Sequence, residues 1–222
     1  DGYSFQNRFV GDYVLYGTGN TWWTPDAKGT TLVAAAVRSD DVTQIPLDHG
    51  VERIEAMGAD AIVVGADKKD LHFQAIELTA GPRPSLGDRY TLEGASQGET
   101  RSHAFFFKPD PRERDNTAGV MALPVARAAR PGHRQLVENS ASILFLRRAA
   151  RQFRPLGELE ANESGVVDDA CQASCVDWYG NARPIFLSKR TFALMGYEIV
   201  EGELGDRNIR EKRRINFAPR AK

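Results

Sequence analysis

The feature that most constrains the fold of this chain is a long series of short apolar runs, each bounded by Gly, Pro, Asp or Asn. Such runs predict β-strands, because β-branched and aromatic residues pack well on a pleated sheet and turn residues end the pairing. The runs collect into groups of about four, which cover residues 12–58, 60–100, 103–160 and 183–217. The sequence therefore predicts an all-β chain of four-stranded antiparallel sheets with very little helix.

The last group indicates how these sheets pack. "RTFALMG" is apolar on both faces, whereas the final run, "NIREKRRINF", alternates. Strict alternation places Ile209, Ile215 and Phe217 on one face and Arg210, Lys212 and Arg214 on the other. Cations on an edge strand discourage pairing with another molecule. Successive meanders with an apolar middle and a polar rim favour a β-propeller of four-stranded blades; a large β-sandwich or barrel is the alternative, because strand count does not fix sheet packing.

About four blades are expected in this chain. They either close as a small propeller or form the C-terminal portion of a larger one, and the chain is one domain in both cases. The sequence opens on Asp1 rather than on methionine, which favours the second interpretation. We therefore expect the remainder of a larger chain upstream.

Charge and motif content narrow the classes of function. The chain has 29 basic and 30 acidic residues, so no global field favours nucleic acid, and no apolar stretch reaches the roughly 20 residues of a membrane helix. The basic runs at 146–154 and 210–222 have acidic neighbours and are interpreted as solvated edge strands. The P-loop, dinucleotide-binding and HExxH zinc-protease motifs are absent from the sequence, and no cofactor is expected. An enzyme is disfavoured but stays open, because propeller enzymes build sites from separated loops.

Two stretches carry a family resemblance. "GASQGETRSHAFFF" and "ARPIFLSKRTFALMGYEIVEG" resemble bacterial secreted proteins with a C-terminal β-propeller domain that is distantly related to WD-repeat propellers. The chain departs from true WD repeats, because each unit lacks the Gly-His and Trp-Asp signatures. The resemblance implies a propeller in an extracytoplasmic setting, and it implies no catalytic residue.

The first candidate site lies in "GETRSHAFFF". If the strand extends back from the phenylalanines, Glu99, Arg101 and His103 share one face and line the entry to a central channel. The alternative is structural: Glu99 and Arg101 pair with each other, and His103 bonds a loop carbonyl. A ligand site and a simple ion pair therefore both remain open.

Three further groups of residues are candidates. Asp70 and His72 share a strand face and form a weak metal or acid-base candidate that needs a third group, such as His49 or Asp48. Trp22 and Trp23 lie in a loop, either packed on the sheet or presented to a partner. Cys171 and Cys175 fit a local disulfide and an oxidising compartment, with two free thiols as the alternative and a metal site as the weakest one. The candidate residues of these three groups are Asp70, His72, Trp22, Trp23, Cys171 and Cys175.

Two functions follow as hypotheses. The first is a non-catalytic, extracytoplasmic propeller module that binds a protein, peptide or glycan through its loop rim or central channel. The second is a propeller enzyme, a hydrolase or lyase, with a channel site near Glu99, Arg101 and His103.

Overall fold

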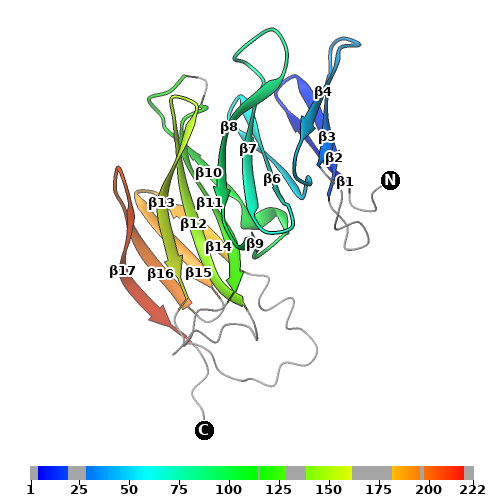
Figure 1. The fold of residues 1–222 in the computed structure, drawn as a ribbon. Coiled ribbons are helices and arrows are strands. Elements are labelled where there is room, and N and C mark those ends of the chain that lie inside the picture. Colours follow the sequence, from blue (N-terminus) through cyan, green and yellow to red (C-terminus); the bar gives the residue numbers. More distant parts are fainter. Residues whose placement is uncertain are drawn as a thin grey trace. The chain divides into compact units, whose positions relative to one another are not determined.

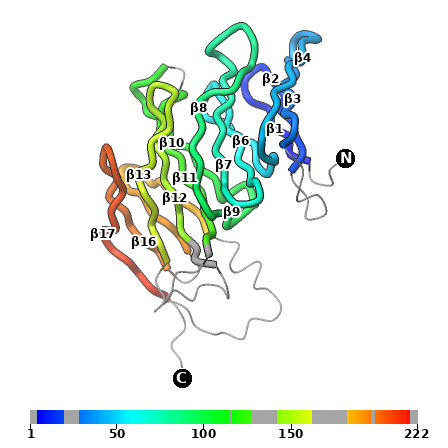
Figure 2. The backbone as a smooth tube through the Cα atoms, in the orientation of Figure 1, coloured from blue at the N-terminus to red at the C-terminus, as the bar shows by residue number. Residues whose placement is uncertain are grey.

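The computed structural model describes residues 5–19, 29–114, 116–128, 139–161, 182–195 and 198–217. Over these ranges the strands form four antiparallel sheets of four or five strands, so the predicted all-β class is confirmed (Figure 1). Each sheet is a meander of consecutive strands, and the tube in Figure 2 turns back where the structure describes the connection within a sheet. In the same ranges, no helix has the length and apolar character needed to cross a membrane.

The chain divides into two compact units. The first comprises Asp1–Ser96, Pro109–Gly119 and Arg148–Phe153. The second comprises Gln97–Lys108, Val120–Arg147 and Arg154–Lys222. Each unit therefore draws on more than one segment of the chain.

The first unit contains two four-stranded sheets that share one apolar core. Leu15, Leu32 and Ile45 of the first sheet are buried in the same cluster as Val63 and Ile76 of the second. The middle strands of the second sheet are buried on both faces, including the few polar residues within them. The strands are β1 (Phe5–Val10), β2 (Tyr13–Thr18), β3 (Thr30–Ala36), β4 (Val42–Leu47), β5 (Arg53–Met57), β6 (Asp60–Ala66), β7 (Leu71–Glu77) and β8 (Ser85–Leu92).

The strand membership of the first two sheets differs from the expected grouping. The run at 51–58 was expected to close the first group, but β5 pairs with β6 and opens the second sheet. The two are joined by a two-residue turn in which Gly58 has a φ of 65°, a value that favours glycine. The first sheet instead opens with β1, whose sequence "FQNRFV" is too polar to read as a buried strand. The order of the four sheets along the chain is unchanged.

The second unit contains most of the third sheet and all of the fourth. Val120, Ile143 and Leu156 of the third sheet share a core with Ala193 and Val200 of the fourth. Both sheets have the membership that the sequence predicted, apart from a short additional strand, β9, that pairs with β11. The strands are β9 (Ala95–Gln97), β10 (Phe106–Pro109), β11 (Gly119–Ala128), β12 (Asn139–Ala149), β13 (Gln152–Glu160), β14 (Arg183–Leu187), β15 (Arg190–Met195), β16 (Glu198–Leu204) and β17 (Ile209–Asn216).

A β-bulge in the fourth sheet corrects the strict alternation expected for the last strand. The register between β16 and β17 shifts between Glu201 and Gly202, and Lys212 is the extra residue with no partner opposite it. Because one extra residue moves all later side chains to the other face, Ile209 is buried whereas Ile215 is 49% exposed. The prediction that these two isoleucines share a face is therefore wrong.

Candidate functional site

Glu99, Arg101 and His103 do not lie on an extended strand. His103 belongs to a 3₁₀ turn, η1 (Ser102–Ala104), and β10 begins only at Phe106. The buried Glu99 carboxylate accepts a hydrogen bond from the backbone N–H of Arg101 at 2.8 Å and lies 3.8 Å from the Arg101 guanidinium. These contacts place the Glu99 carboxylate against Arg101, and the shared strand face is not formed.

His72 and Asp70 make separate local contacts. His72 Nε2 donates to Asp67 Oδ2 at 2.9 Å, and His72 Nδ1 lies 3.1 Å from the Thr91 hydroxyl. Asp70 Oδ1 accepts from the backbone N–H of Gly94. The two residues that share a strand face in the sequence thus have different partners.

The side chains of His49 and His72 are in contact. The sequence had only suggested His49 as one possible neighbour of His72. Their rings stack with centroids 5.0 Å apart and an angle of 21° between their planes. His49 Nδ1 lies 2.8 Å from the carbonyl oxygen of Gly50. A carbonyl only accepts, so Nδ1 carries the proton and Nε2 holds the lone pair of the neutral ring.

Burial keeps His49 neutral. The residue is fully buried, and its Nε2 has no hydrogen-bond partner. Burial lowers the pKa of His49, and the neighbouring charge of His72 lowers it further, against the Gly50 carbonyl, which raises it. This arrangement requires glycine at position 65, because a Cβ at Gly65 would lie 1.8 Å from the Gly50 carbonyl oxygen.

The pair of histidines does not extend into a metal site among the described residues. Asp48, the other proposed third group, holds Arg89 with two short contacts of 2.5 and 2.7 Å. Asp67 stays ionised: burial raises its pKa, but the N–H groups of Lys69 and Asp70 and the His72 ring lower it to about 2. No group of three or more His, Cys, Asp or Glu suited to a metal occurs in the described ranges.

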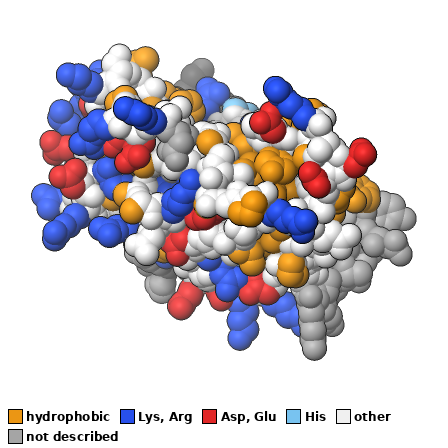
Figure 3. Space-filling view, turned by 90° about the horizontal axis from the view of Figure 1, so that it is seen from above, with side chains coloured by type: hydrophobic (Ala, Val, Ile, Leu, Met, Phe, Trp, Pro, Cys, Tyr) orange, Lys and Arg blue, Asp and Glu red, His pale blue; other side chains and the backbone are white. Residues whose placement is uncertain are grey.

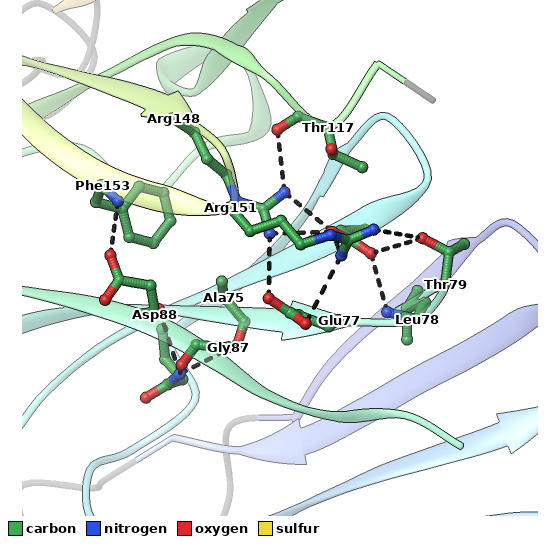
Figure 4. Close-up of polar contacts among 12 residues, drawn as sticks. Ala75, Glu77, Leu78, Thr79, Gly87, Asp88, Thr117, Arg148, Arg151 and Phe153 are labelled. Atoms are coloured by element: carbon green, nitrogen blue, oxygen red, sulfur yellow. Dashed lines mark hydrogen bonds and ion pairs between the residues drawn. The ribbon is translucent and has the colours of Figure 1, made fainter. Parts of the chain in front are cut away.

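A buried ion network in the first unit has no counterpart in the sequence prediction (Figure 4). Arg148, fully buried, donates twice to Asp60 Oδ2 at 3.0 Å and once to the carbonyl of Thr117. Arg151 donates to the same carboxylate at 2.6 Å, and Glu77 lies within 4 Å of both guanidiniums. Two cations face two carboxylates, so the network is neutral and its role is structural. Spacing along the chain gives no signal for it, because Asp60 and Arg148 are 88 residues apart.

The outward face of the first sheet is uncharged and partly exposed. The register aligns two neighbouring rows of side chains across the four strands. The first row is Phe9, Val14, Ala35 and Val42, and the second is Asn7, Tyr16, Val33 and Gln44. Phe9 is 71% exposed and Val42 is 59% exposed. We call this surface the β1–β4 outer face, which comprises Phe5, Asn7, Phe9, Val14, Tyr16, Thr31, Val33, Ala35, Val42, Gln44 and Pro46.

The surface of the chain is uneven in character. Figure 3 shows hydrophobic side chains gathered in one region and Lys and Arg side chains in another. None of the residues of the β1–β4 outer face is charged, although 27% of the whole chain is. The most exposed apolar residues of this face are Phe5, Phe9 and Val42, with the polar residues Asn7 and Gln44 between and beside them.

Two pairs of candidate residues fall outside the described ranges. These are Trp22 with Trp23 and Cys171 with Cys175. The loop platform and the disulfide therefore stay predictions from the sequence.

No family model matches this chain, and no curated protein matches it either. The function of the chain is therefore inferred from its geometry.

Proposed function

We propose that this chain is part of a β-propeller and that it acts as a non-catalytic module that binds a protein through the β1–β4 outer face. The observation that carries the proposal is the absence of charge from that exposed apolar face. The proposal moves the binding surface from the loop rim, which the sequence favoured, to the face of a sheet.

The sheet order and packing support the propeller part of the proposal. Four consecutive meanders follow one another along the chain, and each unit buries two of them against one another. In addition, β6 and β7 are buried on both faces, as the inner strands of a blade are. An experimental structure with two isolated sandwiches would contradict this part.

The composition of the face indicates the chemistry of its partner. The inner face of the same sheet is covered by an apolar four-stranded sheet, which shows what kind of surface fits these strands. The outer face offers no ion pair to a charged partner, and burying a charge against it would be costly. We therefore infer that the partner presents an apolar, uncharged β-sheet.

The exposed area is large enough for a specific contact. Phe5, Phe9, Tyr16 and Val42 are 62%, 71%, 44% and 59% exposed. Together these four side chains expose on the order of 400 Å², which is the scale of the largest apolar patch on a typical monomer. Burial of this patch would supply most of the core of a small interface.

The sheet-like partner can be tested with the chain itself as the probe, because a second copy presents the same uncharged sheet. We expect the chain to self-associate in sedimentation equilibrium and to bind an apolar fluorescent dye. Phe9→Ser should weaken association by about tenfold, the usual effect of losing a central aromatic anchor. Leu187→Ser is the matched control, since Leu187 is 60% exposed on a strand of the second unit.

Two results would overturn the proposal. One is a chain that stays monomeric and binds no dye at every accessible concentration. The other is an equal effect of Phe9→Ser and Leu187→Ser, which would mean that association is not specific to the β1–β4 outer face. The extracytoplasmic setting and the likeness to secreted bacterial propeller proteins remain proposals that rest on the sequence.

A further inference from the structure

The outward face of the fourth sheet differs from the β1–β4 outer face, because it carries a cluster of charges around a cavity. The cavity has a volume of about 390 Å³ and is lined by Arg190, Glu201, Lys212 and Arg213. This volume lies in the range of small-ligand sites. All four residues belong to the second unit, so the cavity is complete within it.

Glu201 fixes the geometry of the cations. Arg190 Nε and Nη2 each donate to one oxygen of the Glu201 carboxylate at 2.8 Å, which is a bidentate pair. The Arg190 guanidinium also lies over the Phe192 ring, 4.7 Å from its centroid. Arg213 Nη2 lies 3.5 Å from the same carboxylate. Two guanidiniums are therefore held in place before any ligand arrives.

The β-bulge adds the third cation. In a regular strand, Lys212 and Arg213 would point to opposite faces of the sheet. Because Lys212 is the extra residue of the bulge, both side chains line the same cavity. Bulges re-aim side chains in this way next to functional sites.

The charges in the cavity do not balance. Three cations surround a single carboxylate, which leaves two positive charges uncompensated in the lining. Glu201 stays ionised, because its hydrogen bonds with Arg190 and the charges of Lys212 and Arg213 lower its pKa, so the excess in the lining is two positive charges. The arrangement is therefore complementary to a ligand with two negative charges.

We propose that this cavity binds a phosphate or sulfate group, either as the free ion or as a monoester on a larger molecule. The Nε–Nη2 fork of Arg190 is taken by Glu201, so the oxyanion would contact the remaining N–H groups of Arg190 and those of Arg213. Guanidinium N–H groups suit tetrahedral oxyanions, and the Lys212 ammonium adds a point charge. The site lies on a different sheet and in a different unit from the β1–β4 outer face. A result that rules out the phosphate or sulfate site would therefore leave the proposed protein contact untouched, and the reverse also holds.

The test is isothermal titration calorimetry with inorganic phosphate, inorganic sulfate and methyl phosphate at constant ionic strength. We expect saturable one-site binding to the intact chain. Arg213→Gln should weaken it by about tenfold, the effect of losing one charged hydrogen-bond partner. Tighter binding of methyl phosphate than of inorganic phosphate would assign the site to a monoester, and equal binding would assign it to the free ion.

Arg210→Gln is the matched control. Arg210 lies on the same strand and opposite Glu203, outside the cavity lining, and its replacement removes the same charge. We expect it to change the affinity by less than about twofold, because surface fields are screened by salt. Equal weakening by both substitutions, or titration without saturation, would overturn the site. If Arg213→Gln does not fold, Lys212→Gln replaces it, since this exposed side chain stands in a bulge.

Discussion

Replacing Arg148 tests whether the buried ion network holds the first unit together. In Arg148→Met, the methionine keeps the apolar stem but removes the guanidinium that donates twice to Asp60. The fully buried Asp60 carboxylate keeps Arg151 at 2.6 Å and the backbone N–H of Leu78 at 3.0 Å. Breaking a buried pair costs about 3–5 kcal/mol, and the remaining partners place this case at the lower end.

We therefore expect Arg148→Met to lower the free energy of unfolding by about 3 kcal/mol, or the melting temperature by about 6–12 °C for a chain of this size. Urea unfolding followed by circular dichroism measures the change. The double variant with Asp60→Asn should lose less than the sum of the two single variants, because they disrupt the same contact. Arg38→Met is the control, since Arg38 pairs with Asp12 on the surface with 85% of its side chain exposed. A loss below about 1 kcal/mol for Arg148→Met, or strict additivity, would refute the reasoning.

Two other changes test the environment of the histidine pair. Gly65→Ala should cost about 2–3 kcal/mol in urea unfolding, because its Cβ would lie 1.8 Å from the Gly50 carbonyl, whereas Gly17→Ala should cost less because it meets only a side chain. The pKa of His49 is lowered from 6.5 by burial, so the unfolded chain takes up a proton that the folded chain resists, and stability should fall as the pH drops below about 6.5. The pKa of Asp67 is about 2, so its contribution should be present above about pH 4 and lost as the pH falls toward 2. Unfolding midpoints across this range that show no slope near pH 6 in the native chain would contradict the role of His49.

Local composition was enough to predict most strands but not the partners at the sheet edges. The run that became β6 is apolar from Ala61 to Ala66, so its burial on both faces follows from the sequence, whereas β7 also buries His72 and Gln74. By contrast, β1 carries three consecutive polar residues, Gln6 to Arg8, and only hydrogen bonding with β2 makes it a strand. The bulge at Lys212 could not be predicted either, because it depends on the register with β16.

Polar clusters were harder to predict, because they depend on contacts distant in sequence. The stacking of His49 on His72 joins a loop to a strand, and the sequence only suggested that the two residues could meet. Glu99 and Arg101 lie within 4 Å of each other, but they stand in an irregular segment before the 3₁₀ turn and not on the expected strand. The sequence therefore located residues of interest without giving the geometry that decides their chemistry.

The two outward-facing sheet surfaces differ in a way that favours different ligands. On the first sheet, the row that contains Phe9 and Val42 exposes apolar side chains and carries no charge. Such a row is suited to packing against another β-sheet. On the fourth sheet, Arg190 and Arg213 are exposed around a carboxylate, and a neutral sheet that covered them would have to remove their charges from water. Desolvation of unpaired charges is costly, so such a cover would be unstable without an anion. The same strand architecture thus supports an apolar protein contact at one sheet and an oxyanion site at the other.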